Sequence, residues 1–97
     1  MRYEIILAPE AANDFRRLKA HSRAEVRDAH ERHLRHEPTK TSRSRIKRLR
    51  GLSRPQCRLR VGEIRIFYDV SSGSVEVLAI VAKSQAEAWL RQAGESL

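Results

Sequence analysis

The sequence of 97 residues is poor in cysteine and has no long apolar run. Its one cysteine, Cys57, cannot form an internal disulfide, which is typical of a protein from a reducing compartment. The longest apolar runs, residues 5–8 and 77–82, are far too short to cross a bilayer. An acid, Glu4, stands ahead of the first run, so we expect no secretory signal peptide. These scarcities favour a protein that works in the cytoplasm and has no membrane partner.

Acidic residues are scarce in one part of the chain. Residues 40–65 hold ten of the twenty Lys and Arg residues and a single acid, Glu63, so this segment carries a formal charge of +9. The rest of the chain is close to neutral, which leaves the net charge of +8. Much of the charge lies among Ser, Thr and Pro rather than in a basic amphipathic helix, which disfavours membrane binding. Such a patch on a small domain is typical of proteins that bind nucleic acid.

The N-terminal half predicts a strand followed by two helices. Alternation of apolar residues predicts the strand over residues 3–8, and Pro9 suits the first position of the helix that follows. Ser22 and Glu25 have the spacing of a capping box, which predicts that a second helix begins there. Pro38 ends this helix, because the residue before a proline disfavours the α conformation. The two helices are expected to pack as a hairpin.

The C-terminal half predicts three strands and a last helix. Residues 39–55 form a basic connector, and strands are then expected at residues 57–61, 64–70 and 75–82. Ser84 and Glu87 give a second capping-box spacing, which begins the final helix. The order β-α-α-β-β-β-α predicts a small single α+β domain over residues 1–97. We expect an antiparallel four-stranded sheet, an N-terminal helical hairpin and a C-terminal helix.

A two-residue turn at Gly62-Glu63 predicts the register of the first hairpin. It places Arg60 opposite Arg65, and Arg58 opposite Phe67. Because side chains alternate along a strand, one face is apolar and faces the core. The core face comprises Cys57, Leu59, Val61, Ile64, Ile66, Tyr68 and Val70. The opposite face carries the three arginines and Phe67, and the Ser72-Gly73 turn is expected to add Leu78 and Ile80 to it.

The pair of arginines across this hairpin is the sharpest functional signal. Like charges directly opposite each other destabilise a hairpin by something under about 1 kcal/mol, and a bound anion removes that cost. The alternative is that these three arginines are solvated or paired with Glu63, Glu76 or Glu87. Three arginines on one face beside an aromatic ring favour phosphate binding, and Phe67 can stack on an unpaired base.

Other reactive residues are weaker candidates. His30, His33 and His36 recur every third residue, but this spacing drifts around a helix and no acid or cysteine set completes a metal site. Cys57 falls on the apolar face with no histidine placed beside it, which favours a core residue over a nucleophile. Tyr68 is likewise expected in the core. The sequence therefore predicts neither a metal nor another cofactor.

Residues 56–68 closely resemble the central hairpin of the RelE/ParE superfamily of bacterial toxins. Residues 7–11 resemble that family's first strand-to-helix junction, residues 47–52 its motif before the hairpin, and residues 80–90 its last strand and helix. The resemblance extends from residue 3 to residue 90. It implies the toxin of a toxin–antitoxin system, with a cognate antitoxin as partner in a hetero-oligomer.

The RelE-like branch implies a ribosome-dependent mRNA endoribonuclease, or mRNA interferase, that inhibits translation and contacts mRNA and rRNA. Its members use no metal: the 2′-hydroxyl attacks the adjacent phosphate. By resemblance, the catalytic positions are Arg58, Arg60, Arg65 and Lys83. RNA-binding positions are Lys47, Arg48, Arg50, Phe67 and Trp89, although Trp89 can equally anchor the last helix in the core.

Two departures from the family pattern leave other functions open. The tandem positions hold Arg58 and Arg60 where lysine is usual, and a guanidinium is a poor base. Trp89 stands where a tyrosine is usual and offers no hydroxyl, so Lys83 is the remaining candidate for proton transfer. One alternative is a ParE-like toxin that binds DNA gyrase without catalysis. The other is a non-catalytic basic RNA-binding module.

Overall fold

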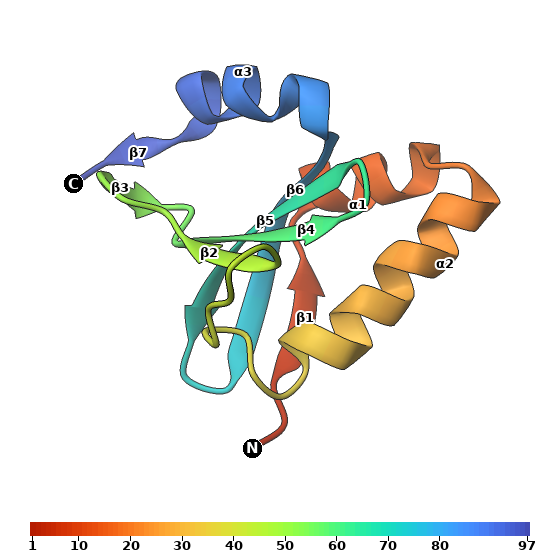
Figure 1. The fold of residues 1–97 in the computed structure, drawn as a ribbon, viewed down its shortest axis with the longest axis horizontal. Helices are drawn as coiled ribbons and strands as arrows, with labels where there is room; N and C mark the ends of the chain where they lie inside the picture. Colours follow the sequence, from red (N-terminus) through yellow and green to blue (C-terminus); the bar gives the residue numbers. More distant parts are fainter.

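A mixed five-stranded sheet forms the centre of the molecule in the computed structural model, which describes residues 1–97 (Figure 1). The strand order is β1-β6-β5-β4-β2, and a separate two-stranded sheet pairs β3 with β7. The elements are β1 (Glu4–Leu7), α1 (Pro9–Arg17), α2 (Ala20–Ala29), the π-helical turn η1 (His30–Leu34), β2 (Ile46–Arg48), β3 (Leu52–Arg54), β4 (Cys57–Val61), β5 (Ile64–Ser71), β6 (Ser74–Ala82), α3 (Lys83–Ala93) and β7 (Glu95–Ser96).

The α+β class, the helical hairpin and the terminal helix are confirmed, but the sheet differs from the four-stranded antiparallel one expected. Strand β1 pairs with β6 in parallel, because α1 and α2 carry the chain away from the sheet before it returns. The basic connector supplies a fifth strand, since Ile46 is buried opposite Leu59 and brings β2 onto the edge of β4. None of the helices has the length and apolar character that crossing a membrane requires.

Both predicted capping boxes are absent. Helix α2 begins at Ala20 and α3 begins at Lys83, and neither has a side chain bonded to its first turn. Pro9, in contrast, occupies the start of α1 as predicted. Helices of this length depend on tertiary packing more than on local signals, so a capping-box spacing alone does not determine where each begins. The cap signal therefore placed the N-cap of α2 at Ser22, three residues after the observed N-cap, Lys19.

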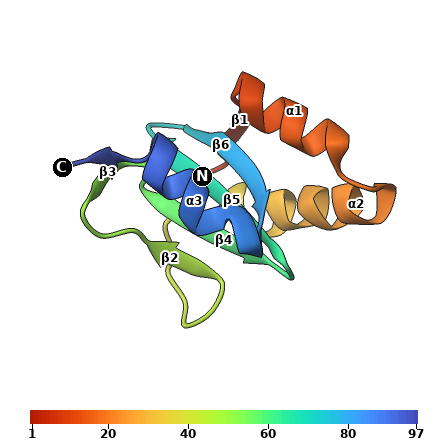
Figure 2. The ribbon, with the colours of Figure 1, turned by 90° about the horizontal axis from the view of Figure 1, so that it is seen from above.

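The helices cover the two faces of the sheet unequally (Figures 1 and 2). Helices α1 and α2 bury Ala11, Val26 and Ala29 against Leu59 and Ile66 in the main core. Tyr68 lies in the same core, and its hydroxyl donates to the Pro38 carbonyl over 2.6 Å. Helix α3 crosses the opposite face alone and contacts β5 and β6. The face below α3 is therefore covered by a single helix, whereas two helices cover the other face.

His30 provides a pH-dependent test of the main core. The residue is buried, its Nε2 has no hydrogen-bond partner, and burial lowers its pKa from 6.5 to about 4. The unfolded chain therefore binds a proton between pH 6.5 and pH 4 that the folded chain does not. This residue alone is expected to lower the unfolding free energy by about 2 kcal/mol between pH 7 and pH 4.5.

Urea unfolding at the two pH values measures this loss. Carboxylates also titrate in this range, so the readout is the difference between wild type and His30→Met, which fills similar volume and does not titrate. We expect the variant to lose less stability on acidification. Equal losses in the two proteins would show that His30 does not couple protonation to unfolding.

Candidate nucleic-acid interface

The hairpin of β4 and β5 has the register that its turn predicted. Five pairs are formed, and they include Arg58 with Phe67 and Arg60 with Arg65. Gly62 has a φ of +56° and no other residue type in the chain has a positive φ, which fits the predicted turn with glycine first. The three arginines therefore emerge on the sheet face that α3 crosses. We call Arg58, Arg60 and Arg65 the arginine face.

One prediction about the neighbouring strand was wrong. Ile80 was expected on the arginine side of the sheet, but it pairs with Ile66 and is buried in the main core. A bulge in the β5–β6 ladder leaves Leu78 without a partner, so Phe67 pairs with Ala79 instead. Beyond the bulge every side chain changes face. Leu78 keeps its predicted side and lines a cavity with Trp89.

The basic connector contributes one residue to the arginine face. Lys47 pairs with Arg58 across β2 and β4, so both side chains lie on the same side of the sheet. Arg48 pairs with Cys57 and therefore belongs to the other side, where it is exposed at the edge. Arg50 is exposed in the bend between β2 and β3. The sequence motif thus places only Lys47 beside the arginines.

The three arginines lie at different depths. Arg60 is exposed, Arg58 is half-buried, and Arg65 is only 7% exposed. The Nη1 of Arg65 donates to the Gly62 carbonyl over 2.8 Å and to the Ile64 carbonyl over 3.0 Å. These bonds attach the guanidinium to its own turn. Arg65 is thus held in a fixed position instead of being solvated.

No acid pairs with any residue of the arginine face. The acids that the alternative interpretation offered are used elsewhere or are free: Glu76 pairs with Arg54 over 3.0 Å, and Glu87 pairs with Arg91 over 3.7 Å. Glu63 forms no ion pair. The pairing alternative is therefore wrong for these three arginines, and their charge is available to a ligand.

Arg58 carries the largest electrostatic cost on this face. Its Nε is buried without a partner, and its Nη2 makes only a long contact of 3.5 Å with the Ser44 carbonyl. Burial, followed by the charges of Arg65 and Arg60, lowers the pKa of Arg58. A guanidinium remains charged despite such shifts. A bound anion would give Arg58 the partner that the chain itself does not supply.

Phe67 and Trp89 stack on each other. Their ring centroids are 4.9 Å apart at an interplanar angle of 10°, and Phe67 is 1% exposed. Phe67 therefore cannot stack on a base as predicted, because α3 covers it. Trp89 is half-buried and lines a cavity of about 360 Å³ with Pro9, Arg54 and Leu78. The stack attaches α3 to the sheet.

Lys83 lies beside the hairpin turn. It is the first residue of α3, its side chain is exposed, and its backbone N–H donates to the Glu63 carbonyl over 2.7 Å. Together with Glu63, Ser84 and Glu87 it lines an open cavity of about 460 Å³. The sequence did not single out these two acids as neighbours of Lys83. Lys83 thus lies at the end of the arginine face that is nearest the hairpin turn.

The remaining predicted candidates lie away from this face. Cys57 is buried in the main core as predicted, and burial raises the pKa of its thiol, which disfavours reaction as a thiolate. His30 is also in that core, while His36 is exposed near the N-terminus and contacts the Met1 carbonyl. No group of three His, Cys, Asp or Glu side chains is arranged to hold a metal ion.

The fold resembles two solved toxin–antitoxin structures. A chain of the RelBE2 toxin–antitoxin complex from Mycobacterium tuberculosis matches with a TM-score of 0.69 at 22% identity, over 84% of this chain and 99% of that chain. A chain of the archaeal RelE–RelB complex from Pyrococcus horikoshii OT3 matches with a TM-score of 0.64 at 20% identity, over 88% and 99% of the two chains. No family model and no curated protein matches. The chain therefore has a RelE-like fold.

Proposed function

We propose that this protein is the toxin of a toxin–antitoxin pair and cuts mRNA on the ribosome, which inhibits translation. The observation that carries the proposal is the arginine face, where three arginine side chains emerge on the same side of the hairpin without an acidic partner. A phosphate is the ligand that such a cluster suits best. The RelE-like fold supports the same function, since both solved relatives are toxin–antitoxin complexes.

The proposed reaction is attack of a 2′-hydroxyl on the adjacent phosphodiester. The 2′-oxygen loses its proton and bonds to phosphorus, the bond to the 5′-oxygen breaks, and that oxygen takes up a proton. The products are a 2′,3′-cyclic phosphate and a 5′-hydroxyl. Negative charge grows on the phosphate oxygens in the transition state. Arg58, Arg60 and Arg65 stabilise this charge, and Arg65 does so from a position that its turn already fixes.

Proton transfer requires a group other than the arginines. A guanidinium holds its proton too strongly to act as a base at neutral pH. We assign proton transfer to Lys83, an exposed residue whose backbone is bonded to the hairpin turn. Lys47 binds RNA from beside Arg58, while Arg48 and Arg50 contact RNA farther along the connector. Trp89 has one ring face committed to Phe67, which limits it to the edge of the bound RNA.

The proposed protein partner is an antitoxin whose binding segment is acidic. Such segments are typically disordered until they bind, and a net charge of +8 favours their association electrostatically. The antitoxin covers the arginine face or displaces α3, none of whose residues is fully buried. We propose that the complex forms in the cytoplasm.

The proposed function is tested by expressing the protein without an antitoxin and mapping breaks in translated transcripts by primer extension. We expect breaks inside codons of translated messages and none in the same messages when translation initiation is blocked. A DNA gyrase supercoiling assay runs beside it. Loss of supercoiling without mRNA breaks would instead indicate a ParE-like toxin, and RNA binding with neither effect would indicate a non-catalytic module.

A further inference from the structure

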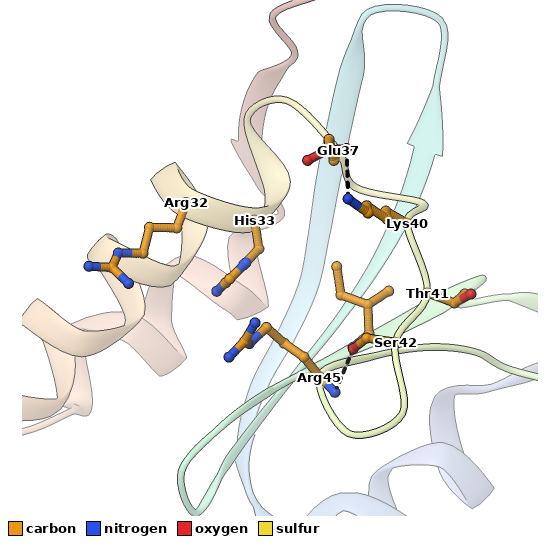
Figure 3. Close-up of a pocket in the computed structure, with 8 residues that line it drawn as sticks. Arg32, His33, Glu37, Lys40, Thr41, Ser42 and Arg45 are labelled. Carbon is orange, nitrogen blue, oxygen red and sulfur yellow. Dashed lines mark hydrogen bonds and ion pairs between the residues drawn. The ribbon is translucent and has the colours of Figure 1, made fainter.

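A second cationic cavity lies outside the arginine face, where η1 ends and the chain returns to β2 (Figure 3). Its volume is about 240 Å³. Its lining includes Arg32, His33, Glu37, Lys40, Ser42 and Arg45. Three permanently charged cations thus surround this space against a single acid. The proposed reaction uses none of these residues.

Arg45 is the cation in this cavity that lacks a partner. Arg32 pairs with Asp28 over 3.2 Å, and Lys40 pairs with Glu37 over 3.5 Å. Arg45 forms no ion pair, and its side chain and that of His33 point toward one another (Figure 3). The free positive charge of the cavity is therefore concentrated at Arg45.

Ser42 fixes the position of Arg45 and adds a donor. Its Oγ accepts from the Arg45 N–H over 3.0 Å and from the Ile46 N–H over 3.2 Å. These two bonds hold the loop in place before β2 begins. Because the Oγ acts only as an acceptor in them, the hydroxyl hydrogen stays free to bond to a ligand in the cavity. The cavity thus combines a guanidinium, an imidazole and a hydroxyl.

His33 reports the electrostatic potential inside the cavity. The side chain is half-buried, and burial is the main cause that lowers its pKa. The charges of Arg45 and Arg32 lower the pKa further, while Asp28 raises it. An anion beside His33 would oppose both arginines. Binding of an anion is therefore expected to raise the pKa of His33.

The cavity and the arginine face are joined through the backbone at the sheet edge. The Arg60 N–H donates to the Arg45 carbonyl over 2.9 Å, so the two arginines are backbone neighbours across β4 and the start of β2. Arg60 is the exposed member of the arginine face. An RNA strand that leaves this face at Arg60 would cross the β2 edge and meet Arg45. This connection favours RNA over an acidic peptide as the source of the anion.

We propose that the cavity at Arg45, His33 and Ser42 is a second phosphate site, which holds a backbone phosphate of RNA outside the reacting nucleotide. The identity of the RNA rests on the proposed function, whereas phosphate binding does not. Contacts of this kind position an RNA strand and add affinity without reading its sequence.

The test is an NMR titration of the His33 imidazole in the full chain, with His36 as an internal reference outside the cavity. The probes are inorganic phosphate and a single-stranded RNA oligonucleotide that carries a 2′-deoxy linkage at any cleavage position. We expect both probes to raise the pKa of His33 and to leave the imidazole signals of His36 in place. Arg45→Ala should abolish the His33 response and weaken RNA binding about tenfold.

Arg43→Ala is the matched control, because Arg43 lies in the same loop, is exposed and does not line the cavity. We expect it to retain the His33 response and to bind RNA within about twofold of wild type, a change typical of one screened surface charge. Equal losses in the two variants would show diffuse charge attraction and overturn the site. The absence of any His33 response would overturn it as well, and so would a response to an acidic peptide, titrated as a third ligand, without a response to phosphate or RNA.

The two proposals fail separately. A His33 response to phosphate and RNA in a protein that makes no mRNA breaks would contradict the nuclease but support the second site. Codon-internal mRNA breaks made by a protein whose His33 responds to neither probe would support the nuclease and contradict the second site. A response to inorganic phosphate alone would assign the cavity to free phosphate and overturn its role in RNA binding.

Discussion

Arg65→Ala is expected to lower mRNA cleavage by about 100-fold or more, which is the usual cost of removing a fixed donor from a developing oxyanion. Arg65 is the most rigidly held member of the arginine face, because the Gly62 and Ile64 carbonyls bind its Nη1. Its charge therefore needs no reorganisation when the phosphate becomes more negative. Primer extension on translated transcripts measures the loss. Arg91→Ala, which removes an exposed arginine on α3, is the control for net charge and should cut normally.

The same bonds also give Arg65 a structural role, so loss of stability must be measured separately from loss of cleavage. Loss of two bonds to turn carbonyls is expected to lower the unfolding free energy by about 1–2 kcal/mol, so thermal unfolding of the variant is recorded first. Arg65→Lys keeps a cationic donor for the turn and is expected to remain folded while cleavage still falls, because an ammonium cannot make the same two-point contact. A folded Arg65→Ala protein that cuts at the wild-type rate would remove Arg65 from the mechanism.

Arg58→Met is expected to stabilise the protein while it weakens RNA binding. The methionine keeps the apolar stem but removes a buried, unpartnered Nε and the repulsion from Arg60 and Arg65. Relief of like-charge repulsion across strands is worth something under about 1 kcal/mol in unfolding free energy. Loss of a charged hydrogen bond to phosphate weakens binding by about 10- to 100-fold.

Urea unfolding of the Arg58→Met protein measures the expected gain in stability, and RNA titration of the same protein measures the expected loss of affinity. Leu59→Met, one residue along the strand on the core face, controls for a methionine in β4 and should leave RNA binding unchanged. A less stable Arg58→Met protein would show that the guanidinium is satisfied in the free chain. Arg58 would then need no bound anion to satisfy its guanidinium.

Local sequence was sufficient to predict the register of the β4–β5 hairpin, because a two-residue turn determines it. Gly62-Glu63 allows one register, and strict alternation on either side then places Arg58, Arg60 and Arg65 together. The same reasoning failed at Ile80, because a bulge in β6 depends on how β5 and the covering helix pack and leaves no mark in the strand itself. A single extra residue at Leu78 was enough to move Ile80 from one face to the other.

Long-range contacts account for the remaining differences. β2 has three residues with one apolar side chain, and only its pairing with β4 makes it a strand. Phe67 was predicted to be open to a base because its cover, Trp89, comes 22 positions later on a separate helix. Ser22 and Ser84 are good caps by composition, yet α2 begins at Ala20 and α3 at Lys83, so each serine lies inside its helix. The cavity at Arg45 is lined by residues of both η1 and the connector, so neither segment alone predicts it.

The stacked rings below α3 make the protein its own optical reporter. Trp89 is the sole tryptophan of the chain, and its indole lies against Phe67 in a partly dry environment. Any partner that lifts α3 from the sheet separates the rings and exposes the indole to water, which shifts tryptophan emission to longer wavelength. Fluorescence can therefore follow the movement of this helix in real time, without a label.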